Sequence, residues 1–175
     1  METKLLIKRA KRGDKEALLQ LVMLRKEEYY KLAYVYMKNE DDAMDAMQDM
    51  IVILYDNISK LRKDESFYSW SKTILVNECK SKLKNKKKIL SLEDIEEPTV
   101  YEIYGSTEER MVLEEYLSQL SEKHQEVIKL RFFLDLDYES ISEILKIPIG
   151  TVKSRISIGM EKLRESMRGG KIEKY

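Results

Sequence analysis

Apolar residues recur at helical spacing through the N-terminal half of the chain, and short polar breaks separate the runs. The spacing predicts four helices, over residues 3–12, 14–36, 40–58 and 66–86. Gly13 ends the first helix, and Asp14 is a suitable N-cap for the second. The predicted buried positions of the last two helices are Met44, Met47, Ile51, Leu54 and Ile58, and then Phe67, Trp70 and Ile74.

The C-terminal half contains a different arrangement of short helices. After a lead-in helix that begins near residue 107, the pattern predicts helices over residues 121–133 and 138–145. In the first of these two, Val127, Ile128, Leu130 and Phe132 are expected to face inward. A break that ends at Pro148 precedes a last helix, because proline suits the first turn.

The last helix has one apolar and one polar face. Val152, Ile156 and Leu163 share a side, so Lys153, Ser154, Ser157 and Glu161 fall on the opposite, exposed side. Two short helices, a tight turn and a helix that exposes Lys and Ser describe a helix-turn-helix, which lays its second helix in the major groove. An ordinary three-helix packing motif is the alternative.

Between the two halves, residues 90–106 contain Pro98 and Gly105 among mostly acidic residues, which is typical of an interdomain linker. The sequence therefore predicts an all-α fold. It consists of two small helical domains, residues 1–89 and 107–168, joined by a flexible linker, and the C-terminal domain contains the helix-turn-helix.

Charge is balanced overall but unevenly distributed along the chain. The 175 residues carry 32 Lys and Arg and 32 Asp and Glu, so net charge alone gives no argument for nucleic-acid binding. Residues 60–88 hold ten basic side chains against three acidic ones, and residues 93–115 hold nine acidic ones against Arg110. This order indicates a basic surface that binds nucleic acid, followed by an acidic linker that does not bind it.

The composition excludes several kinds of chemistry. With Cys79 as the only cysteine and His124 as the only histidine, we expect no disulfide, no metal site and no His-based catalytic triad. His124 is expected at the surface or facing the helix dipole. No glycine loop for phosphate is present, so we expect no cofactor and no catalytic residue. No signal peptide or membrane-spanning stretch appears, which favours the cytoplasm and excludes membrane insertion.

One run of residues is specific enough to indicate a family. LSEKHQEVIKLRFFLDLDYESISEILKIPIGTVKSRI, and above all IGTVKSR at residues 149–155, resembles the C-terminal DNA-binding region of bacterial sigma factors. The N-terminal half resembles the first conserved domain of the same family, and the chain length points to its extracytoplasmic-function group. The resemblance implies a subunit that directs core RNA polymerase to promoters, with an anti-sigma factor as a further candidate partner.

The resemblance also implies roles for the helix-turn-helix residues. The last helix would read the minus-thirty-five element of promoter DNA. Lys153, Ser154 and Ser157, with Thr151 beside them, would contact bases, since Lys donates to guanine and a hydroxyl donates or accepts. We expect mainly phosphate contacts from Arg155, Lys129 and Arg131.

In the N-terminal domain, the resemblance assigns two further surfaces. Asp45, Gln48 and Asp49 match the family string that docks on the clamp coiled coil of RNA polymerase, although a merely solvated acidic face is the alternative. The minus-ten element would be captured as melted DNA, with a flipped base held by the turn at residues 61–66 and by Asn77. The candidate residues are Leu61, Arg62, Lys63, Asp64, Thr73, Asn77, Lys80 and Lys84.

The chain departs from the family at this surface. Ser81 and Lys82 stand where many relatives carry an acid and an aromatic, and Lys63 stands where some have glycine. The base preference of this chain is therefore expected to differ.

Two other functions fit the pattern. A helix-turn-helix regulator would bind duplex DNA as a symmetric dimer on a palindromic site without polymerase, whereas a sigma factor reads two unlike elements as a monomer on core enzyme. A helical adaptor without DNA binding is disfavoured by the cationic residues 153–155 on a well-formed recognition helix.

Overall fold

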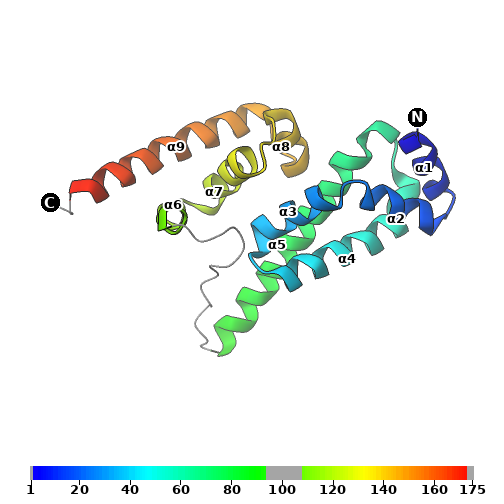
Figure 1. Ribbon diagram of the computed structural model, residues 1–175, viewed down its shortest axis with the longest axis horizontal. Helices are drawn as coiled ribbons and strands as arrows, with labels where there is room; N and C mark the ends of the chain where they lie inside the picture. Colours follow the sequence, from blue (N-terminus) through cyan, green and yellow to red (C-terminus); the bar gives the residue numbers. More distant parts are fainter. Residues whose placement is uncertain (1, 94–107, 173–175) are drawn as a thin grey trace. The chain divides into compact units, whose positions relative to one another are not determined.

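The computed structural model describes residues 2–93 and 108–172, and the side chains of residues 2–89 and 112–169. All regular secondary structure in this part of the chain is helical, as predicted (Figure 1). The first group of helices is α1 (Glu2–Lys11), α2 (Lys15–Met23), α3 (Lys26–Met37), α4 (Glu40–Asn57), the short 3-10 turns η1 (Ile58–Lys60) and η2 (Asp64–Ser66), and α5 (Phe67–Glu93). The second group is α6 (Glu108–Ser118), α7 (Glu122–Ile128), the π-helical turn η3 (Lys129–Phe133), α8 (Tyr138–Leu145) and α9 (Ile149–Ile172).

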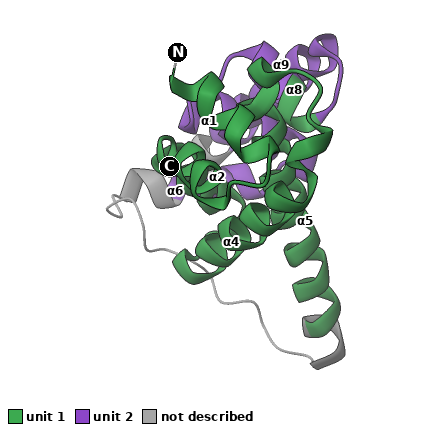
Figure 2. Ribbon diagram, turned by 90° about the vertical axis from the view of Figure 1, so that its right-hand side faces the viewer, with its two compact units in different colours: residues 1–98, 143–145 green, residues 99–142, 146–175 purple. Residues whose placement is uncertain are grey.

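The chain divides into two compact units (Figure 2). One comprises residues 1–98 and 143–145, and the other comprises residues 99–142 and 146–175. Most of the expected linker, residues 94–106, lies outside the described residues, so the proposed domain limits stay predictions. α5 continues past the expected end at residue 86, because no proline or glycine interrupts it before Pro98.

In the N-terminal unit α3, α4 and α5 pack against one another, and α1 packs on α2. The largest fully buried side chains there include Tyr29 and Phe67. Burial raises the pKa of Tyr29 well above its usual value, and its hydroxyl lies 2.6 Å from the Ser71 hydroxyl. A buried phenol that keeps a hydrogen-bond partner stabilises a core without leaving a polar atom unpaired.

Two predictions for the helices before α5 are wrong in detail. The long helix expected over residues 14–36 is two helices, because the chain breaks at Arg25, where no Gly or Pro marks the break. The buried stripe of α4 is also rotated: Met44 is 38% exposed, whereas Ala43, Ala46 and Met50 are fully buried. Alanine has a small side chain, so it lets neighbouring helices approach closely. A prediction that ranks buried positions by the size of the apolar side chain therefore overlooks the alanines.

The buried face of α5 is shifted in the same way. Phe67 is fully buried as expected, but Trp70 and Ile74 are only partly buried. Leu75, Val76 and Cys79 fill the core in their place. Burial raises the pKa of the Cys79 thiol to about 12, so this cysteine stays protonated at neutral pH.

The predicted helix-turn-helix is formed by α8 and α9. Asp137 caps α8 by accepting a hydrogen bond from the Ser140 N–H at 2.7 Å, and Lys146 ends it in the left-handed conformation, with φ of 56°. Pro148 follows immediately before α9. The limits of α8 agree with the prediction, because both of its ends carry local signals.

The helix expected over residues 121–133 changes character at Lys129. The last five residues form the π-helical turn η3, whose wider turn shifts residues off the α-helical period. As a result Phe132, expected inside, is 55% exposed. His124, expected at the surface, is buried between α7 and α9, where its Cβ lies close to Gly159.

Candidate DNA and polymerase interfaces

The predicted recognition helix α9 has the two faces that the sequence indicates. Val152, Ile156 and Leu163 are buried, and Lys153, Ser154 and Ser157 are exposed. The Ser154 hydroxyl donates to the Thr151 carbonyl at 3.1 Å, so its oxygen remains available as an acceptor. This face is short-chained and cationic, which allows close approach to base edges in a major groove.

The three side chains expected to contact phosphate differ in placement. Arg155 is partly exposed on α9, whereas Arg131 donates to the Leu136 carbonyl at 3.0 Å and lies 5.4 Å from the Tyr138 ring. Lys129 is buried, and its ammonium lies 3.0 Å from the Glu114 carboxylate of α6. This placement does not support a phosphate contact by Lys129, because η3 directs the side chain toward α6 and away from solvent.

The acidic residues of α4 lie on its outer face, as predicted. Asp45 and Gln48 are exposed, and the Asp49 side chain is 50% exposed. Asp49 is paired with Lys82 of α5 at 2.6 Å, and Asp42 with Lys86 at 3.3 Å. The hydrogen bond to Asp49 raises the pKa of Lys82 above its usual value, and burial opposes this shift.

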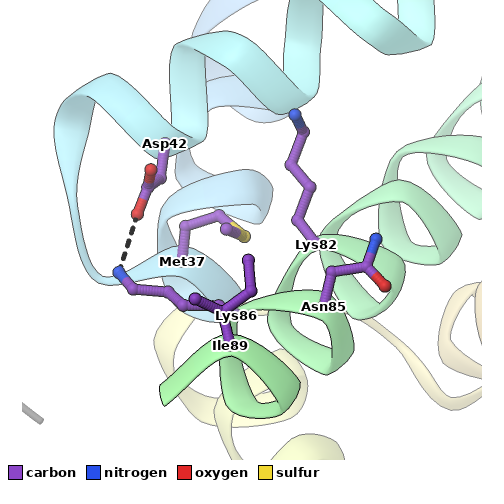
Figure 3. A pocket seen from close by; sticks show the side chains of 6 residues that line it. All are labelled: Met37, Asp42, Lys82, Asn85, Lys86 and Ile89. Atoms are coloured by element: carbon purple, nitrogen blue, oxygen red, sulfur yellow. Dashed lines mark hydrogen bonds and ion pairs between the residues drawn. The ribbon is translucent and has the colours of Figure 1, made fainter. Parts of the chain in front are cut away.

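A shallow pocket of about 300 Å³ lies beside these ion pairs (Figure 3). Met37 of α3 and Ile89 of α5 supply apolar surface, and Lys86 reaches across to Asp42 on α4 (Figure 3). Lys82 and Asn85 complete its lining. The pocket therefore lies where the basic half of α5 meets the acidic start of α4.

The candidate minus-ten residues fall on the turn between α4 and α5 and along α5 itself. Leu61 is buried, whereas Arg62 and Lys63 are exposed at the tip of the turn. Asp64 is partly buried and paired with Lys11 of α1. Along α5, Asn77, Lys80 and Lys84 are exposed. Thr73 is buried, and its hydroxyl donates to the Ser69 carbonyl at 2.9 Å, so its placement does not support the predicted DNA contact.

Comparison with known families identifies both halves of the chain. Residues 21–89 match the family described as Sigma-70 region 2, and residues 116–165 match Sigma-70, region 4. The RNA polymerase sigma factor SigV of Bacillus subtilis is 32% identical over 157 residues, which cover 88% of this chain and 93% of SigV. The ECF RNA polymerase sigma factor SigW of the same organism is 30% identical, with 93% and 95% of the two chains covered. The chain belongs to the extracytoplasmic-function group of the sigma-70 family.

Solved structures have the same fold as this sigma factor. The structure of CnrH in complex with the cytosolic domain of CnrY matches with a TM-score of 0.68 at 20% identity, over 97% of this chain and 99% of that one. The sigma factor RpoE of Bartonella quintana, solved with the anti-sigma factor NepR, matches with a TM-score of 0.66 at 24% identity, over 85% and 95%.

The family settles the general function. This chain is a sigma factor that directs RNA polymerase to promoters for transcription initiation, and it is a non-enzymatic subunit that binds core polymerase and promoter DNA. Within the described residues, no helix has the length and apolarity needed to cross a membrane.

Sequence reasoning missed the ion pairs that tie these surfaces to the rest of the fold. Lys11 and Asp64 are 53 positions apart, and Lys82 belongs to a different helix from Asp49. No local spacing in a single sequence links such residues. The only signal in the sequence was Lys82 itself, a lysine at a position where the family pattern differs.

Proposed function

We propose that the C-terminal unit of this sigma factor reads the minus-thirty-five element through α9. The observation that carries the proposal is the exposed Lys153, Ser154 and Ser157 face, held outward by the buried Val152 and Ile156 behind it. Lys153 and the two serines contact bases, with Thr151 beside them. Arg155 and Arg131 contact phosphates at the margins.

The N-terminal unit docks on the clamp coiled coil of core RNA polymerase through Asp45, Gln48 and Asp49. Their exposure on α4, opposite the buried Ala46 and Met50, supports a surface role over a structural one. Exposed carboxylates suit a basic partner helix, since complementary charge steers and orients docking.

The same unit captures the melted minus-ten element. Arg62 and Lys63 at the tip of the turn supply positive charge, and the Asn77 amide both donates and accepts hydrogen bonds to an exposed base. Lys80 and Lys84 extend this surface along α5, whereas Thr73 is buried and does not reach it. Leu61 and Asp64 hold the turn in place from beneath, as their partly or fully buried positions indicate.

An anti-sigma factor is a candidate regulator of this chain, and the cytoplasm is the expected site of its action. The support is that RpoE of Bartonella quintana was solved with the anti-sigma factor NepR. The fold match to that structure extends over 85% of this chain.

The experiment that tests the proposal is in vitro transcription with purified core polymerase on a panel of promoters. Systematic changes in each element should show dependence on both a minus-thirty-five and a minus-ten sequence. The Lys153→Ala variant should change only the first dependence, and Asn77→Ala only the second. Transcription that responds to neither element, or variants with exchanged effects, would overturn the assignment of the two surfaces.

A further inference from the structure

The N-terminal helix α1 packs directly on the turn that connects α4 to α5, contacting both η1 and η2. We propose that α1 positions this turn for recognition of the minus-ten element, with Lys11 as the positioning residue. The inference rests on the proposed function of the turn and assigns a role to a helix outside residues 21–89, the part that matches region 2.

Two anchors fix the turn, one at each end of its exposed tip. Leu61 is 8% exposed, next to the buried Ile58 of η1. Three residues later, the Asp64 carboxylate accepts a hydrogen bond from the Lys11 ammonium. Arg62 and Lys63 lie between these anchors and face solvent. The placement of the two exposed cations therefore depends on both anchors.

The Lys11–Asp64 pair has the burial that a positioning contact needs. Its side chains are only 24% and 21% exposed, and α1 is itself held by the buried Leu6, Ile7 and Ala10. A partly buried pair is less screened by water and salt than an exposed one. A second pair between the same two elements, Lys4 with Glu65 at 2.9 Å, has both side chains 67% exposed.

Electrostatics gives Lys11 a second effect on the turn. Asp64 is a carboxylate beside a surface that must accept the negative phosphates of a DNA strand. Pairing with Lys11 offsets this charge and holds the carboxylate away from the tip. Without Lys11 the turn would lose an anchor and gain an uncompensated negative charge.

The test is transcription by full-length sigma factor with core polymerase on promoters that differ by single bases in the minus-ten element. Lys11→Met keeps the length of the side chain and removes its charge. We expect the ratio of transcription from the preferred and single-base variant promoters to fall on the order of three- to tenfold, a fraction of what a direct base contact supplies. Lys11→Arg should keep the ratio. Asp64→Asn removes the same anchor but leaves no unpaired carboxylate, so it should lower the ratio less than Lys11→Met does.

Lys4→Met is the matched control, since it removes the exposed pair between the same helix and the same turn. It should leave the ratio unchanged. Core binding and thermal unfolding of every variant are measured alongside, so that a loss of folding is not mistaken for a loss of discrimination. An unchanged ratio in folded Lys11→Met, or an equal fall in Lys11→Arg, would overturn the positioning role.

Arg62→Ala and Asn77→Ala separate this inference from the function on which it rests. If they alter the ratio while Lys11→Met does not, α1 does not position the turn, but the minus-ten surface stands. If none of the three alters it, the proposed minus-ten surface is wrong, and the role of Lys11 falls with it.

Discussion

Asp49 of α4 and Lys82 of α5 form an ion pair at 2.6 Å, which joins the helix assigned to polymerase docking to the helix assigned to DNA. The Asp49 side chain is 50% exposed and that of Lys82 30% exposed. To pair with a basic side chain of polymerase, the Asp49 carboxylate would have to share or give up its ion pair with Lys82. In the proposed docking mode, Lys82 competes with polymerase for Asp49.

Removing that competition should strengthen docking. We expect Lys82→Gln to lower the Kd for core polymerase by about two- to fivefold, since an exposed ion pair contributes up to about 1 kcal/mol. Titration of labelled sigma factor with core enzyme measures the change. The substitution should have no effect when Asp49 is already Asn, and Lys84→Gln on the same helix serves as the control. Weaker binding of Lys82→Gln would mean that Lys82 orients Asp49 or itself contacts polymerase.

Charge reversal on α4 should disrupt docking without disrupting the fold. Asp45→Lys combined with Asp49→Lys alters exposed side chains and removes only the part-exposed Asp49–Lys82 pair, which contributes at most about 1 kcal/mol. Thermal unfolding should therefore change only slightly, while capture of core polymerase falls sharply. Glu16→Lys combined with Glu27→Lys makes the same change in net charge on α2 and α3, and should leave capture intact. Normal capture by the α4 double variant would place the docking surface elsewhere.

The recognition helix permits a prediction about base specificity. Lys153→Ala should cost on the order of 1 to 3 kcal/mol in promoter binding and relax the preference at one or two positions of the minus-thirty-five element. Lys162→Ala, an exposed lysine farther along α9, is the control and should leave the preference unchanged. Competition binding of holoenzyme against single-base promoter variants measures both. A loss that is uniform across all sequences would make Lys153 a phosphate contact.

Local signals explain what the sequence predicted well. The caps at Asp14 and Asp137 each bond an N–H three residues on, and the limits of α8 follow from such signals. The opposite faces of α9 follow from helical spacing alone. The family motifs then placed the candidate surfaces on these elements.

What the sequence could not supply depends on distant contacts. The burial of Lys129 is set by Glu114 on another helix, and that of His124 by the close approach of α9 at Gly159. The break at Arg25 has no Gly or Pro, so the apolar period continues across it. Each of these features is decided by tertiary packing rather than by local preference.

His124 should make the C-terminal unit sensitive to mild acid. Burial lowers its pKa below the usual 6.5, and the positive charges of Lys162, Lys123 and Arg155 lower it further. The unfolded chain therefore binds the proton more readily than the folded chain does, so stability is full above pH 6.5 and is lost as the pH falls toward the folded pKa. The midpoint temperature of thermal unfolding, followed by a probe in this unit, should decrease as the pH is lowered from 7.5 to 5.5.

The control for this prediction is His124→Gln, which removes the titrating group and keeps a side chain that can hydrogen-bond near Ser121. The variant should show a smaller change across the same range. Carboxylates titrate mostly below this window, so they contribute little to the difference. An equal pH dependence in the variant would assign the effect to another group.

Gly159 allows α7 and α9 to pack closely, and a methyl group there should weaken the unit that reads DNA. A Cβ at this position would lie 2.8 Å from Ile128 Cδ1 and 3.2 Å from His124 Cβ. The Ile128 Cδ1 atom can move away by a change of rotamer. The His124 Cβ is attached directly to the backbone, so it can shift only if α7 shifts. Overpacking of this kind costs about 1 to 3 kcal/mol, which equals or exceeds the roughly 1 kcal/mol that alanine gains over glycine inside a helix.

Gly150→Ala on the same helix is the matched control, because a Cβ at Gly150 would have no neighbouring atom within 4 Å. We expect Gly159→Ala to lower the free energy of unfolding of the C-terminal unit and Gly150→Ala to leave it equal or raise it. Chemical denaturation of the full chain, followed by a probe in this unit, measures both. If the helices separate to accept the methyl group, promoter binding should fall together with stability, since Lys153 and Ser157 are presented by the same helix. A Gly159→Ala variant as stable as Gly150→Ala would mean that α7 yields freely, and that close packing at Gly159 does not hold the recognition helix in place.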